Sequence, residues 1–110
     1  MAFDEGLAER VRMCVFDEPD VTEKRMFGGL AFLVSGHMTV AVGDDGLMVR
    51  VDRDDEPQLL ELPGVTGTVM GRRRMRGWLD LDYSAIENDD ELTAWVARSV
   101  AFVHTLPPKT

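Results

Sequence analysis

The sequence predicts an α+β domain in which a bent antiparallel β-sheet is flanked by an N-terminal and a C-terminal helix. Apolar residues recur at helical spacing over residues 3–15 and again over 88–106. Between them lie short alternating segments separated by turns rich in glycine and aspartate. The 110 residues suit one domain, residues 1–110, and a hydrophobic content of 45% is enough for one core.

The N-terminal segment has the pattern of an amphipathic helix. Asp4 is placed to cap its start, and segment 17–20, which contains Pro19, is expected to end it. The apolar residues that share one face are Phe3, Leu7, Val11, Cys14 and Val15.

Residues 21–51 predict a β meander. Segment 21–34 starts it, with the glycine pair Gly28-Gly29 inside the strand pattern, and segment 35–37 is turn-like. Residues 38–42 alternate, and the Gly-Asp-Asp-Gly run at 43–46 is a strong hairpin signal. Leu47, Val49 and Val51 then line one face of the next strand.

The second half predicts further strands and two helices. Acidic residues and Pro57 favour a short helix over 54–61, and a strand is expected over 65–70. Segment 71–77 is expected to be a loop or turn, and 78–83 a strand with Leu79, Leu81 and Tyr83 facing inward. Asn88, with Glu91 three residues later, predicts the start of the last helix. The apolar face of that helix comprises Leu92, Trp95, Val96, Ser99, Val100, Phe102, Val103 and Leu106.

Composition limits the range of functions. The chain has a net charge of −8 and lacks the excess of basic residues that is typical of a free nucleic-acid binder. Nucleic acid is therefore disfavoured as a partner. The sequence has no apolar run of about 18 residues and no signal-peptide pattern, which predicts no membrane association and a cytoplasmic location. A single cysteine excludes an intramolecular disulfide.

Residues able to carry chemistry are few. Cys14 lies on an apolar helix face, where cysteine is usually a small buried hydrophobe, and His37 and His104 are expected at the surface. Cys14, His37 and His104 are too few for a classical zinc site. The pairs Asp44-Asp45 and Asp80-Asp82 fit a turn and a solvated strand face and lack the spacing of a calcium loop. We therefore expect no catalytic residues, metal or cofactor.

The glycine pair Gly28-Gly29 could cradle a phosphate group. A dinucleotide fingerprint or a P-loop, however, needs further glycines or a following lysine between a strand and a helix, and neither is present. A β-bulge, or room for a ring against bare backbone, is the preferred interpretation.

The candidate interaction residues are Arg72, Arg73, Arg74 and Arg76, four of the chain's 12 basic residues. One interpretation is a contact loop for nucleic acid or an acidic partner protein. The other is pairing with acidic residues of segment 52–56 or with Asp80 and Asp82. The negative charge of the surrounding chain favours pairing, because it would repel a polyanion.

The order of motifs resembles the TfoX N-terminal domain family. The resemblance rests on Met26-Phe27-Gly28-Gly29, on Gly77-Trp78 and on the closing segment 94–107, and it covers nearly the whole chain. It implies an α+β fold with a helix at each end of an antiparallel sheet. The family's namesakes regulate competence for DNA uptake in certain bacteria and usually carry a second, C-terminal domain. The resemblance here is to the N-terminal domain, and the chain is expected to be a stand-alone form of it. The family offers no catalytic residues to carry over.

Together these observations predict a bacterial, non-enzymatic regulatory or protein-interaction module with an unidentified protein partner. Met26, Met48, Met70 and Met75 suggest an adaptable apolar surface and favour a homodimer. Two alternatives remain open. One is a nucleic-acid-associated regulator that binds through segment 72–76. The other is a small-molecule-binding or cryptic enzymatic domain near Gly28-Gly29, Trp78 and Tyr83.

Overall fold

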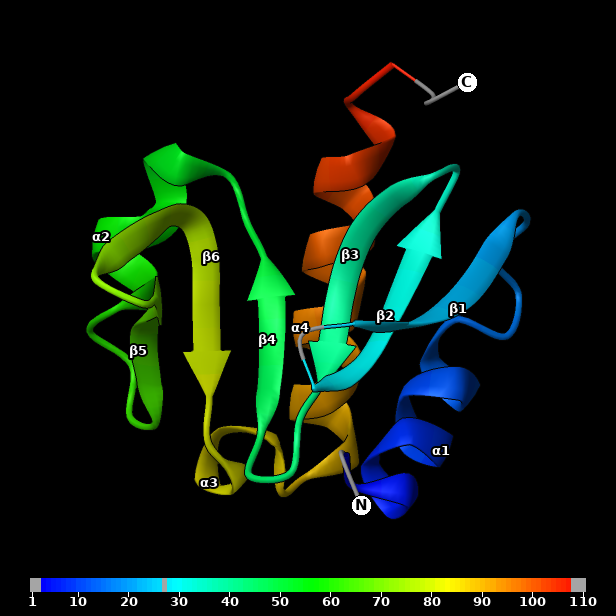
Figure 1. Ribbon diagram of the computed structural model, residues 1–110, viewed down its shortest axis with the longest axis horizontal. Coiled ribbons are helices and arrows are strands. Elements are labelled where there is room, and N and C mark those ends of the chain that lie inside the picture. Colours follow the sequence, from blue (N-terminus) through cyan, green and yellow to red (C-terminus); the bar gives the residue numbers. More distant parts are fainter. Residues whose placement is uncertain (1–2, 27, 108–110) are drawn as a thin grey trace.

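The computed structural model, which describes residues 3–26 and 28–107, contains a six-stranded antiparallel sheet with helices on one of its faces (Figure 1). The strands follow the order β1-β2-β3-β4-β6-β5. The elements are α1 (Glu5–Cys14), β1 (Val21–Met26), β2 (Gly29–Val34), β3 (His37–Val42), β4 (Leu47–Arg50), η1 (Arg53–Asp55), α2 (Glu56–Leu59), β5 (Val65–Met70), β6 (Arg73–Leu81), α3 (Tyr83–Ile86) and α4 (Asp89–His104). The predicted α+β class with helices at both ends is confirmed.

Side-chain caps begin both long helices where the sequence predicts. Asp4 accepts a hydrogen bond of 3.1 Å from the backbone N–H of Leu7, and α1 follows as far as Cys14, shortly before segment 17–20. Asn88 accepts a bond of 2.7 Å from the N–H of Asp90 at the start of α4. Capping satisfies backbone donors that have no partner within the helix and therefore fixes where each helix starts.

One face of the sheet forms the core against the helices. A cross-strand row of buried residues runs over this face, namely Leu30, Val42, Leu47, Leu81 and Val65. Helices α1 and α4 cover this row with Leu7, Val11, Leu92 and Val96. Complete burial of one aliphatic side chain of this kind contributes roughly 1.5–3 kcal/mol.

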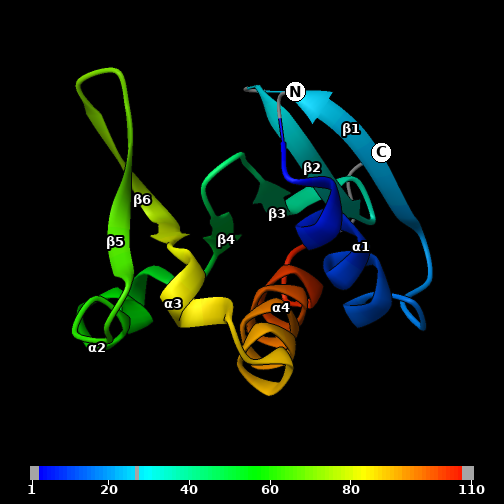
Figure 2. The same cartoon turned by 90° about the horizontal axis from the view of Figure 1, so that it is seen from below.

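The opposite face of the sheet is concave and carries no helix. Figure 2 shows the β1–β2 and β5–β6 hairpins rising on either side of β3 and β4, with α1, α3 and α4 below them. The central cross-strand row on this face is Ala31, Ala41, Met48, Asp80 and Thr66. The two outer hairpins thus form the walls of a trough over β3 and β4.

The glycine pair does not lie within a strand as the sequence suggests. Gly28, with φ of +73°, is in the turn between β1 and β2, and Gly29 is the first residue of β2. The register shift of the β2–β3 pair lies instead between Phe32 and Leu33. The sequence pattern of segment 21–34 does not indicate the turn at Gly28, because the segments on both sides of the turn are rich in strand-forming residues.

Residues 73–77 of the expected loop or turn 71–77 belong to a strand. Only Gly71 and Arg72 form the turn, and β6 begins at Arg73, which pairs with Met70 of β5. The sequence pattern does not predict this strand, because its first residues are charged and have no apolar alternation; hairpin pairing specifies it instead. Its end was also misplaced, since Asp82 caps α3 and Tyr83 is 40% exposed as the first residue of that helix.

In the part of the chain that the structure describes, no helix is both long enough and apolar enough to cross a membrane.

Candidate functional site

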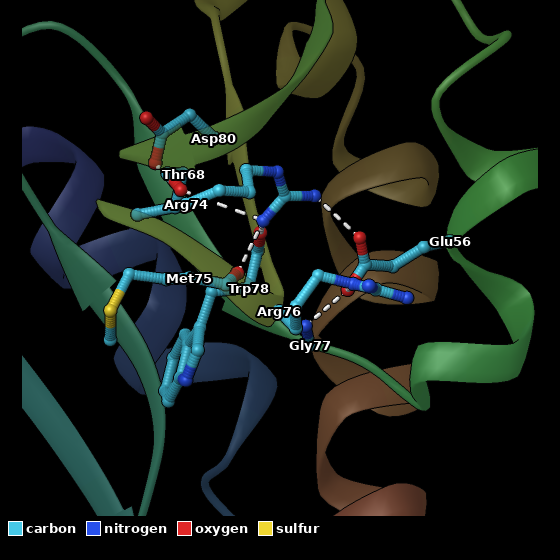
Figure 3. A network of polar contacts seen from close by, with 8 residues as sticks. All are labelled: Glu56, Thr68, Arg74, Met75, Arg76, Gly77, Trp78 and Asp80. Carbon is cyan, nitrogen blue, oxygen red and sulfur yellow. Dashed lines mark hydrogen bonds and ion pairs between the residues drawn. The ribbon is translucent and has the colours of Figure 1, made fainter. Parts of the chain in front are cut away.

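Two of the four candidate arginines form an internal network with a buried carboxylate (Figure 3). Arg74 forms an ion pair with Glu56, the first residue of α2, which is only 3% exposed. The other carboxylate oxygen of Glu56 accepts the backbone N–H of Gly77 and lies 4.0 Å from Nε of Arg76. Each carboxylate oxygen of Glu56 therefore has a hydrogen-bond or ion-pair partner, which a buried charge requires.

The remaining hydrogen bonds of Arg74 join the two strands of its hairpin. Its Nη1 donates to the carbonyl oxygens of Met75, of Trp78 at 3.3 Å and of Thr68 at 3.5 Å. A Cβ at Gly67 would collide with the guanidinium of Arg74, so glycine at that position makes room for it. Arg74 thus ties α2 to the β5–β6 hairpin, which agrees with the pairing interpretation of the sequence.

Arg50 of β4 lies on the other side of the same region, between two aromatic rings. Its guanidinium carbon is 5.6 Å from the ring centroid of Trp78 and 5.8 Å from that of Phe102. It donates a hydrogen bond of 3.3 Å to the carbonyl of Met38, and burial lowers its pKa. These groups border a hollow of about 400 Å³ that Arg73 also lines.

A larger hollow, which we call the concave cleft, occupies the helix-free face of the sheet. It has a volume of about 590 Å³ and is bordered by both hairpins and by the β3–β4 turn. Its lining combines Met26, Met48 and Met70 with Asp45, Asp80 and Asp82. Among the residues that the structure describes around it there is no lysine, arginine or histidine, so the cleft is both apolar and acidic.

The predicted structural motif is divided between the two hollows, with Met26 and Gly29 at the concave cleft and Gly77 and Trp78 at the smaller hollow. Met26 and Gly29 line the cleft at the turn end of the β1–β2 hairpin. A Cβ at Gly29 would overlap with the carbonyl oxygen of Val42, so glycine permits the close approach of the backbones there. Phe27 of the same motif lies outside the described residues. Gly77, which belongs to the second part of the motif, has φ of +87° and accepts the N–H of Val51 through its carbonyl at 2.9 Å.

The cysteine and histidines lie apart from both hollows. His37 is buried, with Nε2 2.5 Å from the carbonyl oxygen of Pro107, so the expectation of a surface position is wrong. His104 is exposed as predicted, and its Nε2 lies 2.5 Å from Oε1 of Glu18. Cys14 is half-buried with its sulfur 3.7 Å from the hydroxyl of Thr93. Over residues 3–26 and 28–107, no three His, Cys, Asp or Glu side chains are grouped as metal ligands.

Two residues of these sites were not singled out from the sequence. Glu56 belongs to the acidic segment offered as a partner for the arginines, but its burial has no sequence signal. Arg50 stands at a polar position of an alternating strand, and its neighbour Trp78 comes from a strand far along the chain. Tertiary pairing alone brings such residues together.

Comparison with known proteins gives one match. The model of the TfoX N-terminal domain family matches residues 16–103, which is most of the chain. No curated protein matches the chain, and no solved structure does.

Proposed function

The chain belongs to the TfoX N-terminal domain family, and from this premise we propose that it is a non-enzymatic regulatory module that binds another protein in its concave cleft. The observation that carries the proposal is the contrast between the two faces of the sheet. Helices cover one face, whereas the other holds an uncovered hollow of about 590 Å³. A hollow of this kind is a common place for binding.

The lining of the cleft indicates the chemistry of the partner. Met26, Met48 and Met70 come from three different strands, and unbranched thioether side chains adapt to irregular apolar surfaces. Asp45, Asp80 and Asp82 place negative charge around them without a basic residue among the described lining. We therefore assign the cleft to a partner segment that carries both apolar and basic side chains.

The polar groups of the cleft favour binding over catalysis. Thr68 is buried and donates a hydrogen bond of 2.8 Å to Oδ1 of Asp80. Nucleophilic catalysis needs a nucleophile next to a base and a third group that orients it. The described residues around the cleft supply threonines and carboxylates without a histidine, lysine or cysteine.

The experiment compares affinity capture by four forms of the chain, namely the native chain, two cleft variants and a control variant. Met48→Lys and Met70→Lys each add a positive charge to the cleft, from its floor and from the β5–β6 hairpin. Ala97→Lys adds the same charge on the exposed side of α4 and serves as the control. We expect the native chain and the control to retain the same partner, which carries a basic and apolar segment, and both cleft variants to lose it.

Hydrogen exchange completes this test. A synthetic peptide of the partner segment should protect backbone amides of β4, β5 and β6 from exchange, and Met48→Lys should abolish this protection. Equal retention of the partner by the cleft variants would overturn the proposal. A substrate converted at a rate that depends on Asp80 would assign the cleft to an enzyme instead.

We also propose a homodimer, and β5 offers the route to it. This strand forms one edge of the sheet, and its sequence Val65–Met70 contains no charged residue, with Val69 56% exposed. Edge strands without charges readily pair with another copy. Sedimentation at micromolar concentration that gives only the 12.3 kDa species would exclude a stable dimer.

A further inference from the structure

Five arginine side chains converge at the end of the sheet where β4 ends and β6 begins. This arginine pocket, of about 400 Å³, is the smaller of the two hollows described above. Its arginines are Arg50 of β4, Arg53 of η1, and Arg73, Arg74 and Arg76 of β6, and they come from segments separated in the sequence. The fold therefore concentrates positive charge beyond the Arg72–Arg76 run.

The positive charge of the pocket is only partly compensated. Glu56 pairs with Arg74 and Arg76. Among the described residues, no carboxylate lies within ion-pair distance of Arg50, Arg53 or Arg73. Of the five arginines that line the pocket, only Arg74 and Arg76 pair with a carboxylate among the described residues.

The guanidinium group of Arg50 is withdrawn from water without an anionic partner among the described residues. Its guanidinium is half-buried between Trp78 and Phe102 and has a carbonyl oxygen rather than a carboxylate as its hydrogen-bond partner. Withdrawing a cation from water is costly unless an anion compensates it. The two rings hold this guanidinium in a fixed position at the pocket wall, where an incoming anion would offset that cost.

The chemistry of arginine favours phosphate over carboxylate at this place. One guanidinium fork can satisfy both oxygens of a carboxylate, whereas a terminal phosphate offers three acceptor oxygens and up to two negative charges. Arginines that approach from β4, η1 and β6 match a group that accepts hydrogen bonds from several directions.

The charge of the whole chain favours a small ligand over a nucleic-acid strand. Of the 12 Lys and Arg residues five line the pocket, which leaves seven, whereas the whole chain has 20 Asp and Glu residues. A polymer would extend past the Debye length of about 8 Å into that negative field. A small molecule stays within the pocket.

We propose that the arginine pocket binds a small phosphorylated molecule, with its phosphate among the guanidinium groups of Arg50, Arg53 and Arg73. The pocket is a second site, separate in its residues from the concave cleft, and it gives a protein-binding module a means of responding to a metabolite. It does not depend on the proposed protein partner, so either can fail without the other.

Calorimetric titration with pyrophosphate at near-physiological salt tests the proposal. Arg53→Gln and Arg73→Gln each remove one exposed guanidinium that makes no ion pair among the described residues, so both variants are expected to fold. Lys24→Gln removes the same charge from β1 and is the control. We expect the native chain and the control to bind pyrophosphate equally, and each arginine variant to bind about tenfold more weakly or worse.

Three results would overturn the proposal. The first is no heat and no NMR shift at Arg50, Trp78 or Arg73 with millimolar pyrophosphate. The second is equal weakening in Lys24→Gln, which would show a response to net charge alone. The third is tighter binding of citrate, or of a single-stranded oligonucleotide with steep salt dependence, which would assign the pocket to carboxylates or to nucleic acid.

Discussion

The hydroxyl of Tyr83 donates a hydrogen bond of 2.5 Å to Oδ2 of Asp4, which joins the start of α3 to the cap of α1. The same carboxylate also caps α1 through its other oxygen. This bond to Asp4 raises the pKa of Tyr83 to about 12, and the phenol in turn lowers the pKa of Asp4. One carboxylate thus fixes two elements of the N-terminal corner.

The first prediction concerns the titration of Tyr83. It is the only tyrosine, so tyrosinate absorbance should report a midpoint near 12 in the folded chain, against 10.0 for a free phenol. The bond contributes fully to stability while Asp4 is ionised and the pH is below 10; its contribution is lost as pH rises toward 12, and also in acid where Asp4 becomes protonated. Asp4→Asn keeps a good cap and should return the midpoint toward 10. An unchanged midpoint in Asp4→Asn would contradict the assignment.

The second prediction concerns Arg10, which connects α1 to the end of α3 and the start of α4. Its Nη2 donates to the carbonyl of Ile86 at 2.7 Å and to Oδ1 of Asp89 at 2.9 Å. Arg10→Ala should lower the free energy of unfolding by roughly 1–3 kcal/mol, because the carbonyl loses its charged donor. Arg12→Ala, which removes surface pairs with Glu9 and Glu23, should cost below about 1 kcal/mol. Urea denaturation measures both values, and equal costs would refute the connecting role of Arg10.

Local rules were sufficient for the parts of the fold that depend on neighbours in the chain. Asp4 and Asn88 cap the helices, and the Gly-Asp-Asp-Gly run joins β3 to β4 as the hairpin signal predicts. Leu47 and Val49 alternate into the core because the period of a strand is two residues. Each of these features is decided within a few residues.

Contacts between segments far apart in the sequence determine the features that local sequence patterns do not predict. β6 begins with charged residues, and its first residue is paired with Met70 across a turn of two residues. Glu56 becomes buried only because Arg74 and Gly77 arrive from that strand to satisfy it. The concave cleft likewise needs both hairpins in place, and no spacing within one segment predicts it.

The third prediction separates the roles of the two motif glycines. Gly28 has a positive φ and nothing near the position of a Cβ, so Gly28→Ala should cost roughly 1–2 kcal/mol through backbone strain alone. Gly29→Ala should cost roughly 2–3 kcal/mol, because its Cβ would overlap with the carbonyl oxygen of Val42.

Asparagine variants distinguish the two mechanisms. Asn tolerates the left-handed region, so Gly28→Asn should recover part of the stability lost in Gly28→Ala. Gly29→Asn should be at least as unstable as Gly29→Ala, since the obstacle there is the carbonyl of Val42 and not the backbone angle. Thermal unfolding of the four variants checks this order, and recovery at position 29 would contradict it.

The fourth prediction concerns the buried carboxylate of Glu56. Glu56→Gln keeps the shape of the side chain but leaves Arg74 without its counter-charge, and the amide nitrogen faces a donor at Arg74 or Gly77. The free energy of unfolding should fall by roughly 1–3 kcal/mol, since Arg74 keeps partial access to water. Asp55→Asn removes the neighbouring exposed pair with Arg98, 3.5 Å apart, and should cost below about 1 kcal/mol. If the two substitutions cost the same, the Glu56 network does not hold α2 to the β5–β6 hairpin.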